Sequence, residues 1–155
     1  MLARVFSILR FNIIPVIFYP LLRNHIHTAR YGLVKGLKRK GGLGFIPQIT
    51  RLTPEVKFLM KLDLGGKTVY DVGAAYGIFT LYFARSVRKN GKVVAFEPNP
   101  RLCRHVIENV KLNCFENVEL LQIALGKERK RETLAFPSSS FGMGSIEKHE
   151  KARFF

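Results

Sequence analysis

Two short apolar segments, each with an acidic residue at or next to its carboxyl end, are separated by a glycine-containing turn and a helix, and they constrain the fold of this chain most strongly. The first, residues 67–72, contains Asp71 and runs into the turn Gly73-Ala-Ala-Tyr-Gly77. Residues 77–89 then have the periodicity of an amphipathic helix, and residues 92–97 form a second apolar segment that ends in Glu97. This order predicts a βαβ nucleotide-binding unit. Glycine has no Cβ, so Gly73 and Gly77 would allow a tight turn and a close approach of the backbone to a ligand.

Helical and strand patterns continue to alternate outside this unit. Thr53-Pro54-Glu55 predicts a helix start, with Thr53 as the N-cap and Pro54 in the first turn. We predict a helix over residues 100–113, strands over 118–125 and 132–136, and a Ser- and Gly-rich loop over 137–145. The alternation indicates an α/β fold, a parallel sheet with helices on its faces. We expect residues 1–52 to be a basic, apolar, helical extension and residues 53–155 to be the domain itself.

The spacing of residues in the turn indicates which cofactor the unit holds. Dinucleotide-binding proteins usually have G-x-G-x-x-G here, whereas this chain has D-x-G-x-x-x-G followed later by Glu97-Pro98. This pattern is similar to that of S-adenosylmethionine-dependent methyltransferases. Their cofactor has no pyrophosphate but carries an amino-acid tail and a sulfonium cation, which suits an acidic residue such as Asp71. Glu97, at the end of the second strand, could accept hydrogen bonds from both ribose hydroxyls.

Several further blocks narrow the resemblance to one family. Residues 69–77, 95–100, 108–113, 117–121 and 124–126 occur in the order and at the gaps typical of FkbM methyltransferases, so the chain resembles that family over roughly residues 67–146, about half its length. The resemblance implies an incomplete Rossmann-like class I methyltransferase fold. It also implies methylation of hydroxyl groups on sugars or related metabolites, with S-adenosylmethionine as the cofactor.

The resemblance further implies which residues hold this cofactor. Eight positions match: Asp71, Gly73, Ala74, Tyr76, Gly77, Glu97, Asn99 and Ala124. The first five would line the methionine side of the cofactor. Glu97 would hold the ribose with Asn99 close by, and Ala124 would face the adenine, which would rest on backbone and apolar contacts.

One part of the family pattern is missing from this sequence. Family members continue with a central strand that carries a Lys-Asp-x-Glu-Gly block, whereas the aspartates of this chain are Asp63 and Asp71. That strand would lie beside residues 68–71, at the switch point where the ligand binds, so its absence leaves an unpaired strand edge. We therefore expect a truncated or split gene product, or a sheet that a second chain completes. The catalytic base is unassigned; Glu147 and His149 are candidates only because they follow the 137–145 loop.

Two functions are consistent with these motifs. The leading one is an S-adenosylmethionine-dependent methyltransferase whose acceptor is a small-molecule or glycan hydroxyl, with in-line transfer and a base that assists the hydroxyl. The alternative is a non-catalytic, methyltransferase-like binding module for a membrane surface or a partner chain. Methylation of RNA ranks below both, so nucleic acid is not the expected partner.

The charge distribution bears on partners and on location. Nine basic residues and no acidic residue precede Glu55, and the whole chain has a net charge of +15. The longest charge-free stretch of this region, residues 11–22, is shorter than the roughly 20 residues a spanning helix needs. It either packs on the domain or lies in a membrane interface. We favour a cytoplasmic protein in which this segment packs on the domain as a helical cap. Peripheral membrane contact through residues 1–40 is the alternative.

The cysteines and histidines form no metal-binding pattern. Cys103 and Cys114 fall in or near one predicted helix at a spacing that no familiar zinc site uses, so we interpret both as reduced, buried thiols. The four histidines form no recognisable ligand set. We therefore predict no metal site.

Overall fold

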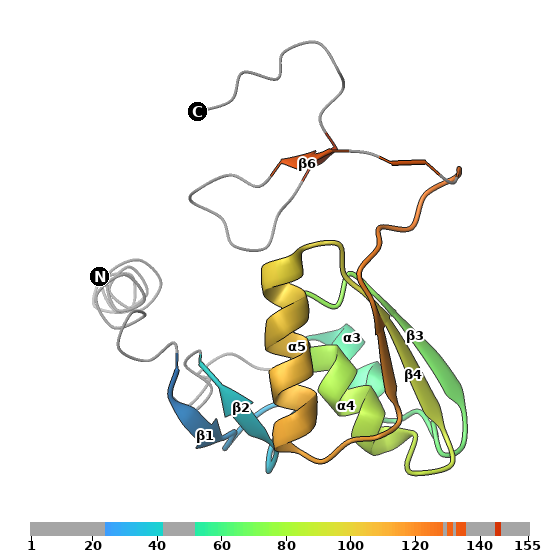
Figure 1. Ribbon diagram of the computed structural model, residues 1–155. Helices are drawn as coiled ribbons and strands as arrows, with labels where there is room; N and C mark the ends of the chain where they lie inside the picture. Colours follow the sequence, from blue (N-terminus) through green and yellow to red (C-terminus); the bar gives the residue numbers. More distant parts are fainter. Residues whose placement is uncertain (1–23, 42–51, 129, 132, 136–144, 147–155) are drawn as a thin grey trace, which may run out of the picture.

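A computed structural model describes residues 24–41, 52–128, 130–131, 133–135 and 145–146 (Figure 1). Its elements, in chain order, are β1 (Ile26–Thr28), β2 (Lys38–Lys40), α3 (Pro54–Leu59), β3 (Thr68–Val72), α4 (Ile78–Ser86), β4 (Lys92–Phe96), α5 (Pro100–Leu112), β5 (Val118–Leu121), β6 (Leu134–Ala135) and β7 (Ser145–Ile146). The alternation from α3 to β5 confirms the predicted order. The predictions made for residues 1–23, for most of the 137–145 loop, and for Glu147 and His149 lie outside the described residues.

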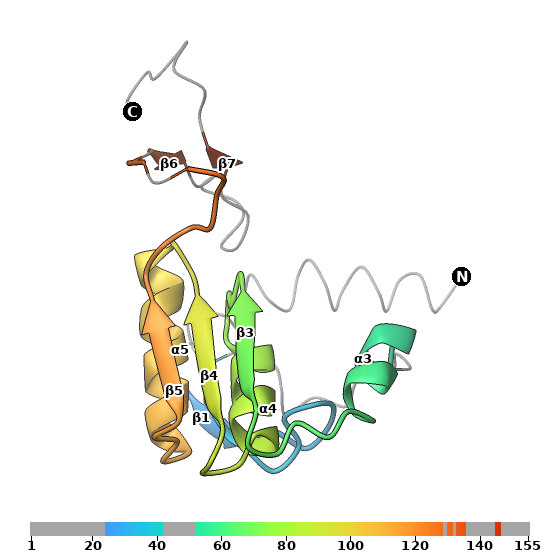
Figure 2. The same ribbon diagram turned by 90° about the vertical axis from the view of Figure 1, so that its right-hand side faces the viewer.

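The central element is a three-stranded parallel sheet in the order β3-β4-β5. Val69 pairs with Val93, and Val93 pairs with Val118. Figure 2 shows α4 and α5 behind this sheet, on the same face, as expected when successive crossovers have the same hand. No described helix covers the opposite face. Within the described residues β3 pairs with β4 alone, so its outer edge is open.

Local sequence explains where the helices begin. Thr53 is the N-cap of α3 and accepts a hydrogen bond from Val56 N at 3.4 Å, and Pro54 lies in the first turn, as predicted. Asn99 caps α5 by accepting a hydrogen bond from Arg101 N at 2.9 Å. In contrast, the N-cap of α4 is Gly77, which provides no side-chain cap. The free N–H groups of its first turn are therefore available to another acceptor.

Residues 24–41, the described part of the predicted helical extension, are not helical, which corrects the prediction for these residues. Strands β1 and β2 form an antiparallel hairpin, with His27 paired to Arg39. The loop between them packs into the same core cluster as α4, where Leu33 and Val34 contact the cluster that contains Leu81 and Val93. The physical reason is a pair of long-range hydrogen bonds. The side chains of Asn109 in α5 and of its C-cap Asn113 accept from the backbone N–H groups of Lys40 and Lys38, which stabilises β2 as a strand.

Strand β5 is shorter than the sequence suggested. We expected a strand over residues 118–125, but β5 ends at Leu121, which pairs with Phe96 at the end of β4. Beyond that point no described strand offers a partner, and both Ile123 and Leu125 are exposed. The predicted strand over 132–136 appears only as β6, which pairs with β7 in a separate two-stranded sheet.

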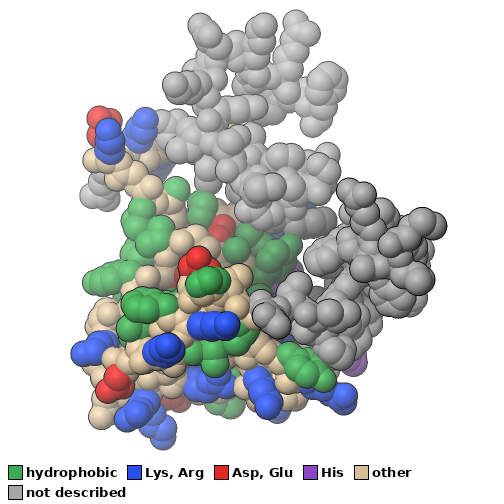
Figure 3. All heavy atoms as spheres, turned by 180° about the vertical axis from the view of Figure 1, so that it is seen from behind, with side chains coloured by type: hydrophobic (Ala, Val, Ile, Leu, Met, Phe, Trp, Pro, Cys, Tyr) green, Lys and Arg blue, Asp and Glu red, His purple; other side chains and the backbone are tan. Residues whose placement is uncertain are grey.

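The described ranges contain neither a membrane-spanning helix nor a metal-binding cluster. None of their helices is both long enough and apolar enough to cross a bilayer. Nor do their His, Cys, Asp and Glu side chains come together in any group that could hold a metal ion. Seen from behind (Figure 3), Lys and Arg side chains gather toward the lower end of the molecule and hydrophobic side chains lie above them.

Candidate functional site

The glycine turn after β3 is fixed to the end of the neighbouring strand. Gly73 N and Ala74 N both donate to Phe96 O, at 2.9 and 3.0 Å. Gly77 has a φ of +74°, and a Cβ added there would lie 3.1 Å from a Val106 methyl carbon of α5. Both the backbone conformation and the close approach of α5 therefore require glycine at position 77. The turn sits at the carboxyl ends of the strands, where open α/β sheets bind ligands.

The carboxylate of Glu97 joins the end of β4 to this turn. It is only 5% exposed, and it accepts hydrogen bonds from Ala75 N at Oε2 and from Asn99 N at Oε1, each at 2.8 Å. Ala75 has a left-handed φ of +49° although it is not glycine, and its bond to Glu97 helps to hold that conformation. Neither ion pair of the described residues involves Glu97. The two carboxylate oxygens of Glu97 have about four acceptor positions in total, and these two hydrogen bonds leave some of them free for further donors.

Asp71 provides a second buried carboxylate at the end of β3. It is 7% exposed, and its Oδ2 accepts a hydrogen bond from Thr80 Oγ1 at 2.5 Å. Burial raises the pKa of Asp71, the Thr80 hydrogen bond opposes that rise, and the nearby charge of Glu97 adds to it. A buried acid of this kind favours a cationic ligand, because a positive charge would offset the cost of keeping it ionised.

The structure gathers most of the other predicted residues around these two acids. Ala74 is buried within the turn, and the ring of Tyr76 lies 6.0 Å from the ring of His105 on α5. Asn99 is buried, but its side chain serves as the cap of α5. Ala124 is exposed beyond the end of β5, and no described interaction joins it to the turn. These positions agree with a shared site for the residues at the ends of β3 and β4.

Sequence reasoning missed two residues that support the site. Thr80 is completely buried on α4 and donates to Asp71. Cys103 is buried on α5, and its Sγ lies 3.0 Å from Glu97 O, while burial raises the pKa of its thiol. A polar residue on the inward face of a predicted helix, as Thr80 is, was the available signal. Cys103 is therefore a structural thiol beside the site, and its predicted burial is confirmed. The same prediction is wrong for Cys114, which is exposed after the end of α5.

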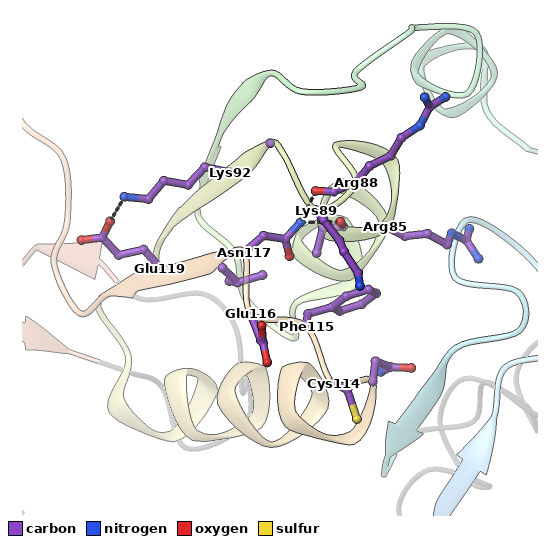
Figure 4. Close-up of a pocket in the computed structure, with 13 residues that line it drawn as sticks. Arg85, Arg88, Lys89, Lys92, Cys114, Phe115, Glu116, Asn117 and Glu119 are labelled. Atoms are coloured by element: carbon purple, nitrogen blue, oxygen red, sulfur yellow. Dashed lines mark hydrogen bonds and ion pairs between the residues drawn. The ribbon is translucent and has the colours of Figure 1, made fainter.

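A groove of about 730 Å³ lies elsewhere, at the opposite end of the sheet (Figure 4). Its wall comes from the carboxyl ends of α4 and α5 and from the starts of β4 and β5. Asn117 Nδ2 donates there to Ala84 O and Arg88 O, and Lys92 pairs with Glu119 at 2.6 Å. These interactions close helix ends and pair charges within the protein. We therefore place the candidate cofactor site at the glycine turn, where two buried carboxylates converge.

Comparison with solved structures gives matches to methyltransferases. A SAM-dependent methyltransferase from Aquifex aeolicus has 28% identity and a TM-score of 0.43, over 51% of this chain and 42% of that chain. A protein-L-isoaspartate O-methyltransferase has 27% identity and a TM-score of 0.39, over 43% and 21%. A SAM-dependent O-methyltransferase from Thermotoga maritima has 25% identity and a TM-score of 0.42, over 49% and 30%. The chain thus spans less than half the length of these proteins. No curated protein matched.

A family model gives the assignment. Residues 46–128 match the model described as Protein-L-isoaspartate(D-aspartate) O-methyltransferase (PCMT), a family that depends on S-adenosylmethionine. The match includes the α/β unit from α3 to β5, the glycine turn, Asp71 and Glu97. Because it covers more than half of the 155 residues, the chain belongs to this family of S-adenosylmethionine-dependent methyltransferases.

Proposed function

We propose that this chain binds S-adenosylmethionine at the glycine turn and forms the cofactor-binding half of an O-methyltransferase. The observation that carries the proposal is the Glu97 carboxylate, which is buried at the end of β4 and joined to the turn through Ala75 N. Its remaining acceptor positions suit two neighbouring hydroxyls, such as those of a ribose. Glu97 would therefore fix the nucleoside end of the cofactor against the sheet.

The other end of the cofactor fits the residues around Asp71. This carboxylate is buried and has a hydroxyl donor, Thr80, but no ion-pair partner among the described residues, so it suits the ammonium of an amino-acid tail. When bound, the cofactor supplies an activated methyl group on a positively charged sulfur. Asp71 and Glu97 would hold its two ends, and much of the rate could then come from alignment with the acceptor.

The binding proposal can be tested by calorimetric titration of the full chain with S-adenosylmethionine. We expect Glu97→Gln to weaken binding about tenfold or more, since a hydrogen bond to a charged group contributes about 1.5–3 kcal/mol. Glu116 is exposed at the opposite end of the sheet, so Glu116→Gln is the matched control and should bind S-adenosylmethionine as tightly as the parent chain does. If the folded parent chain does not bind, or if Glu97→Gln binds equally well, the proposal is wrong.

Two oxygen acceptors have separate support. The FkbM resemblance supports a sugar or metabolite hydroxyl, and the description of the matched family supports a protein carboxyl group. A carboxylate is already ionised at neutral pH and needs no base, whereas a hydroxyl does. In this proposal the two carboxylates at the turn, Asp71 and Glu97, hold the two ends of the cofactor, so a base for a hydroxyl would come from another part of the site.

The product distinguishes these acceptors. Transfer of a labelled methyl group to an isoaspartyl peptide gives an ester, which alkali hydrolyses, whereas transfer to a sugar hydroxyl gives an ether, which alkali leaves intact. Both substrates should be offered to the parent chain and to Glu97→Gln. Label that resists alkali and depends on Glu97 would support the hydroxyl acceptor, and alkali-labile label would support the carboxyl acceptor.

A second chain could be needed for turnover. The outer edge of β3 has no partner among the described residues, and Tyr70 and Val72 on the uncovered face of the sheet are 66% and 62% exposed. Open strand edges with apolar side chains favour pairing with another polypeptide. If no such chain exists, the same surface supports the alternative of a non-catalytic binding module. Cofactor binding without methyl transfer to any acceptor would favour that alternative.

A further inference from the structure

The hairpin formed by β1 and β2 carries a concentrated positive charge. Residues 24–41 contain five basic residues and no acidic residue: Arg30, Lys35, Lys38, Arg39 and Lys40. Lys40 is paired with Glu108 at 3.1 Å, and Arg39 is partly buried. The other three are exposed, and neither ion pair of the described residues involves them. Arg30, Lys35 and Lys38, called here the hairpin cations, are therefore available to an anionic partner.

The backbone that carries these cations is fixed to the domain. Arg85 of α4 donates to Leu33 O at 2.6 Å and to Lys35 O at 2.7 Å. Asn113, the C-cap of α5, accepts from Lys38 N at 2.8 Å and donates to Lys38 O at 2.7 Å. A surface held in this way loses little backbone entropy when a partner binds, which favours docking.

Apolar side chains are exposed on the same hairpin. Tyr31 is 45% exposed next to Arg30, and Ile26 is 51% exposed on β1. Membrane-interface segments combine these features, since basic groups meet lipid phosphates while an aromatic or aliphatic side chain reaches the acyl boundary. This combination of basic and apolar side chains is less suited to a nucleic acid, because its phosphates would bind the cations but it has no hydrocarbon to contact Ile26.

The sequence that leads into the hairpin also favours lipid over nucleic acid. Residues 11–22 contain no charged residue, and Arg10 and Arg23 flank them. Stable attachment to a membrane usually needs two weak signals together, such as an apolar segment and a basic patch. In this chain the two signals are adjacent in sequence.

We propose that the hairpin of residues 24–41 is a docking surface for the anionic face of a lipid bilayer, with the hairpin cations meeting lipid phosphates and Tyr31 and Ile26 at the acyl boundary. The hairpin contacts the carboxyl-terminal half of α5, whereas the glycine turn lies near the start of that helix (Figure 1). A bilayer bound to the hairpin would therefore leave the candidate cofactor site open to its ligands. The proposal does not depend on methyltransferase activity.

Vesicle binding of the full chain tests the proposal. The chain contains no tryptophan, so Tyr31→Trp adds a single fluorescent reporter. We expect the tryptophan emission to shift to the blue on vesicles of phosphatidylcholine with phosphatidylserine, and to shift much less on pure phosphatidylcholine. Binding should weaken as added salt shortens the Debye length to about 8 Å. Changing Arg30, Lys35 and Lys38 to Glu together should lower the vesicle affinity measured by co-sedimentation at least about tenfold. The reason is that each cation near an anionic surface raises the affinity by a factor of about five.

A matched variant separates the hairpin from net charge. Changing Lys89, Lys127 and Arg131 to Glu alters the net charge by the same amount as the hairpin variant, but at exposed positions outside the hairpin. This variant should lose far less vesicle binding than the hairpin variant. Circular dichroism would establish that both variants are folded. The proposal is overturned if the two variants lose binding equally, if pure phosphatidylcholine binds as well as the anionic vesicles, or if a short RNA displaces the chain from anionic vesicles and binds it more tightly.

Discussion

Thr80 and Asp71 are joined by a 2.5 Å hydrogen bond from Oγ1 to Oδ2, which ties the first turn of α4 to the end of β3. Both side chains are buried, so water cannot replace the hydroxyl when it is removed. The bond stabilises the ionised form of Asp71 against the effect of burial. Thr80 is therefore placed to orient the carboxylate that we propose as the partner of the cofactor's ammonium group.

We expect Thr80→Val to weaken S-adenosylmethionine binding about tenfold, because it keeps the shape of the side chain but removes a donor to a charged group. The loss should be larger at low pH, since the pKa of Asp71 would rise further without the hydroxyl. Titration calorimetry across a pH series would measure both effects. Thr80→Ser, which keeps the hydroxyl, is the control and should retain most of the affinity. Equal affinities and pH profiles for Thr80→Val and the parent chain would contradict this role.

The raised pKa of Asp71 also predicts how stability depends on pH. An acid whose folded-state pKa lies above its ordinary value of 3.8 holds its proton more tightly in the folded state. Its contribution to stability is therefore present at pH values below 3.8 and is lost as the pH rises through the folded-state pKa. At neutral pH the buried charge destabilises the fold.

Asp71→Asn should consequently raise the melting temperature at neutral pH while it weakens cofactor binding. The amide keeps an acceptor for Thr80 but carries no charge, so the gain in stability should shrink as the pH falls toward 4. Thermal unfolding followed by circular dichroism at several pH values would measure this. A variant that is less stable than the parent chain at pH 7 would contradict the prediction that the buried charge of Asp71 destabilises the fold.

The side chains of Asn109 and Asn113 connect β2 to α5 and should contribute to stability. Asn109 Oδ1 accepts from Lys40 N at 2.8 Å, and Asn113 both accepts from and donates to the backbone of Lys38. We expect Asn109→Ala to destabilise the fold by about 1–3 kcal/mol, because Asn109 is buried and the amide of Lys40 loses its acceptor. Urea unfolding would measure the free energy, and hydrogen exchange should show faster exchange at Lys40.

An exposed amide side chain provides the comparison for this variant. Gln122→Ala removes a similar group where no hydrogen bond of the side chain is described, and its effect should stay within about 0.5 kcal/mol. If Asn109→Ala were equally mild, the hairpin would owe its position mainly to Leu33 and Val34 in the core.

The sequence was most informative at residues where an acidic side chain falls at the end of a predicted strand. Asp71 and Glu97 could be placed because each ends an apolar strand, and parallel strands bring their carboxyl ends to one edge of the sheet. The hairpin could not be predicted, because its β2 edge is completed by Asn109 and Asn113, about 70 residues away in the chain. Long-range contacts of this kind leave no local pattern.

The third strand illustrates a related limit. Residues 118–125 have a strand-like apolar pattern, yet β5 stops at Leu121 because its partner β4 stops at Phe96. Strand length depends on what the neighbouring strand offers, and one sequence segment does not contain that information. Thr80 did leave a local signal, a polar residue on the inward face of a predicted helix, but its role depends on Asp71 in a different element and is clear only from their contact.

The uncovered face of the sheet predicts concentration-dependent association. Tyr70 and Val72 alternate on this face along β3, where the described structure places no helix, and both are largely exposed. We expect the double change Tyr70→Lys and Val72→Lys to alter stability by no more than about 0.5 kcal/mol per site, since neither side chain is buried. The new charges should nevertheless reduce association through the open edge and face. Sedimentation velocity over a range of protein concentrations would measure this.

The control for that experiment lies on the opposite face. Ile107 on α5 is 42% exposed, so Ile107→Lys also removes an exposed apolar side chain but leaves the sheet unchanged. Association that falls in the β3 variant and persists in Ile107→Lys would locate the contact at the uncovered sheet. If Ile107→Lys, which adds one lysine rather than two, loses about half as much association as the β3 variant, the added positive charge is the cause, because a chain that already carries +15 repels its own copies more strongly with each lysine gained.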